Sequence, residues 1–99
     1  MNNVIFTKDG KKLIYYPNSL ENTHYTIPKE VEIIESNAFS LSKLKSVSFN
    51  KELKEIHEKA FYVNKNMKSL FIPENVERIG KLGFAGNKQL EQVIIVSNE

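Results

Sequence analysis

The sequence contains 99 residues, of which 40% are hydrophobic and 26% charged, and its formal net charge is +2. This length favours a single domain, and so small a positive charge does not indicate nucleic acid or a membrane surface as the partner. The absence of cysteine excludes disulfides, thiol catalysis and thiolate metal sites. The first ten residues lack the basic and apolar regions of a signal peptide, and no apolar run is long enough to span a bilayer. As written, the sequence predicts a cytoplasmic protein or the mature form of an exported one.

Residues 4–16 predict an N-terminal β-hairpin. Asp9-Gly10 suits a type I′ turn, because both residues tolerate the positive φ that this turn requires. The resulting register pairs Phe6 with Leu13, Ile5 with Ile14 and Val4 with Tyr15. Pro17 then ends the second strand, and residues 18–24 form a polar connection.

From Tyr25 onward the apolar positions repeat. The first unit carries Tyr25, Ile27, Val31, Ile34, Ala38, Phe39 and Leu44; the second Val47, Phe49, Leu53, Ile56, Ala60, Phe61 and Met67; the third Leu70, Ile72, Val76, Ile79, Gly83, Phe84 and Leu90. Phe49 follows Ile27 by 22 residues and Ile72 follows Phe49 by 23. Such a period is typical of leucine-rich repeats. We therefore expect one domain over 1–99, with a cap and connection at 1–24, repeats at 25–46, 47–69 and 70–92, and a partial repeat at 93–99.

Each unit predicts one coil of a stack. An alternating segment such as Val47-Ser48-Phe49 predicts a strand on one face, and a second short extended piece leads into a helical turn that ends at the phenylalanine. Coils that stack in register would align Phe39, Phe61 and Phe84 as a structural spine, with ring centroids about 4.5–7 Å apart.

The frame Ile-Pro-x-x-Val-x-x-Ile-x-x-x-Ala-Phe, at Ile27 to Phe39 and, with Gly83 for alanine, at Ile72 to Phe84, resembles the BspA-like leucine-rich-repeat family. The segment FTKDGKKLIYYP resembles the one that often introduces such arrays. The family commonly has cysteine three residues after the phenylalanine, where this chain has Asn64 and Asn87. The resemblance implies an α/β fold: a short right-handed solenoid of mostly parallel strands and helical turns, capped by the hairpin. It also implies a non-enzymatic protein-interaction or adhesion module, which in this family is often secreted or at the cell surface.

Outward positions of the strand face form a column of Thr26, Ser48, Phe71 and Ile94, which becomes apolar toward the C-terminus. Beyond it, Val93 to Val96 form an uncharged edge strand, a type of strand that proteins usually cover or blunt. We expect Thr26, Ser48, Phe71, Ile94 and Val96 to contact a protein partner, unless residues 96–99 fold over this edge. The alternative function is an intracellular scaffold that forms a homodimer through the same edge.

Lysines gather in the loops that follow the phenylalanines, including Lys43. Stacking would bring Lys45 beside Lys68, and Lys65 beside Lys88. Such a stripe suits an anion such as an acidic polysaccharide or nucleic acid, which is the weaker alternative, and it equally suits a solvated lysine-rich edge.

No catalytic or metal site is predicted. His24 and His57 fall on opposite surfaces of the stack, so they cannot share a metal ion. His24 adjoins Ser46, but no acidic residue occupies the neighbouring columns to orient a base. We therefore expect no enzyme activity and no cofactor.

Overall fold

The computed structural model describes residues 3–81 and, for the backbone, residues 92–96. Its strands are β1 (Ile5–Phe6), β2 (Lys12–Tyr15), β3 (His24–Thr26), β4 (Ile33–Ile34), β5 (Ser46–Ser48), β6 (Glu55–Ile56), β7 (Ser69–Pro73), β8 (Arg78–Ile79) and β9 (Gln92–Val96).

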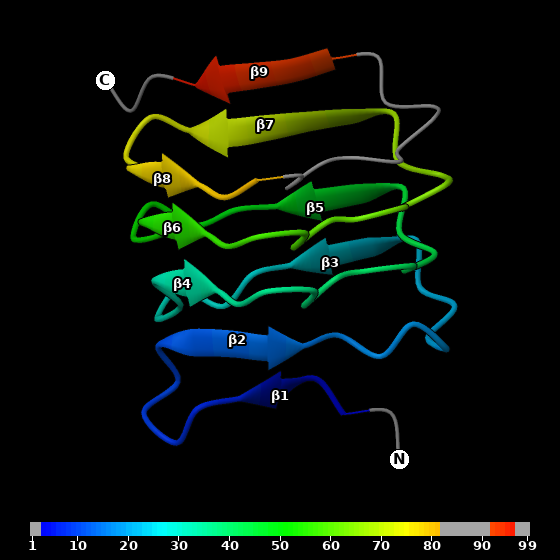
Figure 1. The fold of residues 1–99 in the computed structure, drawn as a ribbon, viewed down its shortest axis with the longest axis horizontal. Helices are drawn as coiled ribbons and strands as arrows, with labels where there is room; N and C mark the ends of the chain where they lie inside the picture. The colour runs from blue at the N-terminus through cyan, green and yellow to red at the C-terminus, as the bar shows by residue number, and fades with distance from the viewer. Residues whose placement is uncertain (1–2, 82–91, 97–99) are drawn as a thin grey trace.

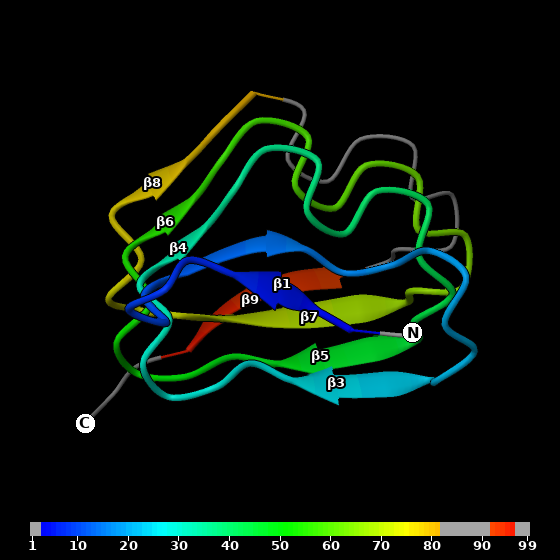
Figure 2. The same cartoon turned by 90° about the horizontal axis from the view of Figure 1, so that it is seen from below.

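The strands form two walls of a stack of coils (Figure 1). One wall is a five-stranded sheet in the order β1-β2-β4-β6-β8, in which every pair except β1 and β2 is parallel. The other wall, called the strand face here, consists of the parallel pairs β3-β5 and β7-β9. Figure 2 looks along the stack, where successive coils overlie one another and turns close each coil on the remaining side.

The turns that close the coils are not helical. The amide N–H groups of Asn37, Phe39 and Leu41 donate to carbonyls of the next coil, at Glu58, Ala60 and Tyr62. Those of Ala38, Ser40 and Ser42, which alternate with them along the sequence, donate to carbonyls three residues earlier in the chain. An α-helix needs its amides to bond within their own segment, so alternate bonding between coils prevents it. The expected helical turns are therefore wrong for this stretch, and the described residues contain only strands and turns.

These turns place four non-glycine residues in the left-handed region. They are Asn37, Leu41, Lys59 and Val63, with φ between 57° and 62°. Residues 37 and 59 occupy one position of successive coils, and residues 41 and 63 another. Left-handed backbone costs an L-residue about 1–2 kcal/mol, is tolerated by asparagine and is least suited to β-branched valine. Leu41 and Val63 therefore adopt this conformation under steric strain.

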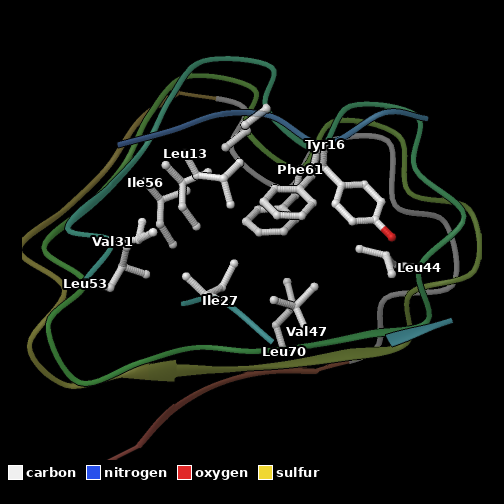
Figure 3. Close-up of a cluster of buried hydrophobic side chains, with 14 of the residues drawn as sticks. Leu13, Tyr16, Ile27, Val31, Leu44, Val47, Leu53, Ile56, Phe61 and Leu70 are labelled. Atoms are coloured by element: carbon white, nitrogen blue, oxygen red, sulfur yellow. The ribbon is translucent and has the colours of Figure 1, made fainter. Parts of the chain in front are cut away.

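The core fills the space between the two walls and the turns (Figure 3). The rings of Phe39 and Phe61 are parallel, with centroids 4.8 Å apart, which lies within the separation expected for the spine. Tyr16 continues the stack on the N-terminal side, 5.2 Å from Phe39. Phe84, the third predicted member of the spine, lies outside the described residues. An aromatic column thus joins the hairpin segment to the repeats.

The hairpin exists, but its register and turn differ from the prediction. Phe6 pairs with Leu13 as expected, whereas Ile5 pairs with Tyr15 because an irregularity interrupts the ladder between Ile5 and Phe6. Gly10 has φ 76° while Asp9 does not have positive φ, so the type I′ turn is wrong.

Side-chain bonds explain the turn that forms instead. The carboxylate of Asp9 accepts hydrogen bonds from the Thr7 hydroxyl at 2.8 Å and the Lys11 amide at 2.9 Å. The Gly10 amide meanwhile donates to the Thr7 carbonyl. Only glycine then has to adopt positive φ.

Strand β2 belongs to both the hairpin and the stack. It pairs in parallel with β4, with Leu13 opposite Ile34, and the Tyr16 amide donates to the carbonyl of Ala38 at 2.8 Å. The hairpin therefore supplies the first rung of the five-stranded sheet.

Candidate binding surfaces

The strand face contains the predicted column. Thr26 pairs with Ser48 across β3 and β5, and Phe71 pairs with Ile94 across β7 and β9. Val96 pairs with Pro73 at the end of β9. For Ile94 and Val96 the structure describes the backbone alone. The register derived from the repeat spacing is therefore correct for Thr26 with Ser48 and for Phe71 with Ile94.

The sequence did not predict an interruption of the strand face between β5 and β7. These two strands are neighbours in the stack, but they do not belong to one ladder. A groove of about 280 Å³ lies here, lined by Val47, Ser48, Phe49, Asn50, Lys51, Phe71 and Pro73. Phe71 is 53% exposed although it is aromatic. We call this hollow the Phe71 groove.

The other end of the strand face is polar. His24 Nδ1 lies 2.7 Å from Ser46 Oγ, and His24 Nε2 lies 3.1 Å from Ser48 Oγ. Thr26 Oγ1 is 3.4 Å from the same Nε2 atom. This exposed hydrogen-bonded group supplies donors and acceptors beside the Phe71 groove, and Ser48 belongs to both.

The lysines of the predicted stripe lie at separate places in the described part of the chain. Lys45 and Lys68 immediately precede β5 and β7, and both are exposed. Lys65 instead lines a separate hollow on the turns together with Lys43, which the predicted columns did not include. Lys88 lies outside the described residues. A continuous stripe of all four lysines is therefore not described.

Charges of opposite sign alternate on the five-stranded sheet. His57 lies between two carboxylates, with Nε2 2.7 Å from Glu55 Oε1 and Nδ1 3.5 Å from Glu35 Oε1. Lys12 Nζ is 3.9 Å from Glu35 Oε2, and Arg78 lies opposite Glu55 in the ladder of β6 and β8. Partly exposed pairs of this kind are each worth only about 0–1 kcal/mol and chiefly favour the register.

Acid should weaken this charged surface. The hydrogen bond from His57, with the positive charges of Arg78, His57 and Lys12, lowers the pKa of Glu55 from its ordinary value of 4.5. Because the folded-state pKa lies below the unfolded one, the stabilisation is present above the unfolded pKa and is lost as pH falls through the folded one. When the pH falls from about 6 to about 3, we expect the free energy of unfolding of Glu55→Gln to decrease less than that of wild type. Urea unfolding at each pH measures this difference. Glu52→Gln, at an exposed position, is the control and should behave like wild type; an equal acid loss in Glu55→Gln would contradict this account.

Neither a metal cluster nor a membrane-spanning helix is found among residues 3–81 and 92–96. His24 and His57 lie on different walls, as expected, and no group of three potential ligands converges in this part of the chain.

The fold and these surfaces define a class of protein, a parallel-stranded repeat stack with an exposed strand face. A protein-family model described as "BspA type Leucine rich repeat region (6 copies)" matches residues 11–99. The chain belongs to this BspA-type leucine-rich-repeat family. The match begins just before β2, in agreement with the pairing of that strand with the stack.

Two solved structures are similar to this chain. A leucine-rich repeat protein from Eubacterium ventriosum ATCC 27560 has 27% sequence identity to this chain and a TM-score of 0.91. The match covers 99% of this chain and 27% of the Eubacterium chain. The pneumococcal vaccine antigen PcpA has 29% sequence identity to this chain and a TM-score of 0.73. That match covers 96% of this chain and 29% of the PcpA chain. The chain therefore spans just over a quarter of the length of each. No curated protein matches it significantly.

Proposed function

We propose that this chain is a protein-binding or adhesion module that recognises its partner through the strand face, with the Phe71 groove at the centre of the contact. The observation that carries the proposal is the exposed ring of Phe71 beside a groove of about 280 Å³. Aromatic side chains next to hollows are typical anchors of protein interfaces. The hydroxyl and imidazole groups around His24 would form the polar rim of the contact.

The stack suits such a role because its binding face is already ordered. Bonds between coils hold β3 against β5 and β7 against β9, so the partner would not have to order a loop. Binding to a preformed surface avoids part of the entropy cost of association. Leucine-rich-repeat families generally act through interactions of this kind. One similar structure is a vaccine antigen, which favours a partner met outside the cell.

A binding screen with two matched variants tests the proposal. Phe71 and Ile14 are both exposed apolar residues, at 53% and 40%, but they lie on opposite walls. We expect an immobilised panel of purified extracellular-matrix proteins to contain one that binds wild type, and Phe71→Lys to weaken that binding about tenfold or more. Ile14→Lys is the control and should bind like wild type. The absence of any binder, or equal weakening by both variants, would refute recognition through the Phe71 groove.

Self-association through β9 is the second candidate function. Among the described strands, β9 pairs only with β7, so its other edge has no partner strand there. Such an edge can pair with a second copy of the chain. Light scattering over a concentration series should then give a dimer for wild type and a monomer for Ile94→Lys. Monomers of both at every concentration would exclude this scaffold role.

A further inference from the structure

A second hollow lies on the turns, and its lining differs entirely from that of the Phe71 groove. It measures about 230 Å³ and is lined by Leu41, Ser42, Lys43, Val63, Lys65 and Asn66. Two successive coils supply equivalent residues, because both turns follow a spine phenylalanine. Asn66 Nδ2 donates to the carbonyl of Lys43 at 3.5 Å, which ties the two turns together.

The apolar wall of this hollow is held in place against backbone preference. Leu41 has φ 62° and Val63 has φ 57°, and Leu41 is 54% exposed. The repeat spacing gives the third unit Gly86 at the same position, two residues after its phenylalanine. Glycine would adopt this conformation freely, so the first two units carry aliphatic side chains here despite the strain. Residues with strained backbone conformations cluster at ligand-binding and other functional sites.

The cations of the hollow are available for a ligand. Lys65 makes no ion pair within the described part of the chain. Lys43 Nζ lies 3.7 Å from Oε2 of Glu21, whose side chain is 83% exposed. A solvated pair of this kind is weak, so a carboxylate from a ligand can replace Glu21.

We propose that this hollow binds an acidic peptide segment of a partner protein, with an aliphatic side chain placed between carboxylates. The aliphatic group would pack against Leu41 and Val63, and the carboxylates would pair with Lys43 and Lys65. A single-stranded nucleic acid would stack its bases on exposed aromatic side chains. The nearest candidate, Tyr62, is covered by Lys59, whose Nζ lies 5.5 Å from the ring centroid. The acidic peptide is thus the ligand whose chemistry matches both kinds of lining residue.

Peptide titrations followed by amide proton–nitrogen NMR spectra of the isotope-labelled chain test this site. The probe is Glu-Glu-Leu-Glu-Glu, compared with Gln-Gln-Leu-Gln-Gln and Glu-Glu-Ser-Glu-Glu. We expect the first peptide to shift signals of residues 41–43 and 63–66, and to bind about tenfold more tightly than either comparison peptide. Binding should weaken as NaCl rises from about 50 to about 300 mM. No binding of the first peptide, or equal binding of the serine peptide, would overturn the proposal; the latter would indicate a general polyanion surface.

The decisive variant carries Leu41→Gly and Val63→Gly together. Both changes relieve left-handed strain, so the variant should melt no lower than wild type, and lost binding would not be due to unfolding. We expect its affinity for Glu-Glu-Leu-Glu-Glu to fall about tenfold. Unchanged affinity would overturn the proposal. Phe71→Lys should leave the affinity for this peptide unchanged, so the test is independent of the proposed function of the strand face. A lower affinity in Phe71→Lys would also overturn the proposal, because the hollow on the turns would then not be a separate site.

Discussion

Replacing Phe61 by alanine is expected to lower the free energy of unfolding by about 3–5 kcal/mol, the range for emptying a buried aromatic site. The side chain is fully buried, and its ring stacks on Phe39 at 4.8 Å and meets the edge of Phe49 at 5.9 Å. A cavity at this point would separate two adjacent coils. Because each coil buries its apolar face mainly against its neighbours, the loss should extend to both.

Urea unfolding followed by circular dichroism measures this effect. The whole free energy of unfolding of a small domain is only about 5–15 kcal/mol, so Phe61→Ala could unfold the chain entirely. Phe61→Leu, which retains most of the side-chain volume, is therefore included as a milder variant. It should be intermediate between wild type and Phe61→Ala. If Phe61→Ala unfolds at the wild-type urea concentration, the aromatic spine does not hold the coils together.

Replacing Tyr16 by alanine is expected to cost a similar amount, about 3–5 kcal/mol. Tyr16 is only 1% exposed, stacks on Phe39 at 5.2 Å and contacts the edge of Tyr25 at 5.1 Å. It is therefore the point at which the hairpin segment joins the core of the repeats. Its loss should destabilise the whole chain in one transition, because β2 pairs directly with β4.

The control for this variant is Tyr16→Phe, which keeps the ring and removes only the hydroxyl. That hydroxyl is neutral at ordinary pH, and burial raises its pKa further. Its removal should therefore cost much less than loss of the ring. Thermal unfolding of the three proteins gives the comparison. A separate early transition in Tyr16→Ala, with the repeats still folded, would mean that the hairpin is a detachable cap.

The repeat spacing predicted the features that depend on alignment of equivalent residues. The pairs Thr26 with Ser48 and Phe71 with Ile94 follow from counting 22 or 23 residues along the sequence. The stacking of Phe39 on Phe61 follows from the same count. Such features are predictable because stacked coils repeat the same environment at a fixed interval.

Features that depend on competition between bonds were not predicted. Local sequence favoured a helical turn before Phe39, but its amide donates to Ala60 in the next coil instead. The Asp9-Gly10 pair favoured a type I′ turn, but hydrogen bonds from Thr7 and Lys11 to the Asp9 carboxylate stabilise a different turn. In each case a contact absent from the local pattern had the larger effect.

The binding surfaces were only partly predictable for a related reason. The spacing identified Phe71 as an exposed aromatic residue, but it implied a continuous sheet and gave no sign of the groove between β5 and β7. Likewise, the strain at Leu41 and Val63 depends on backbone angles that the sequence pattern does not contain. A valine two residues after a spine phenylalanine, where another unit has Gly86, was the available signal.

Amide hydrogen exchange, with and without the protein selected in the binding screen, tests recognition through the strand face most directly. Partner binding should slow exchange at residues 46–51 and 69–73, which include β5, β7 and the lining of the Phe71 groove. Exchange at β4, β6 and β8 on the opposite wall should remain unchanged. Protection confined to that opposite wall, with none at β5 and β7, would contradict the account.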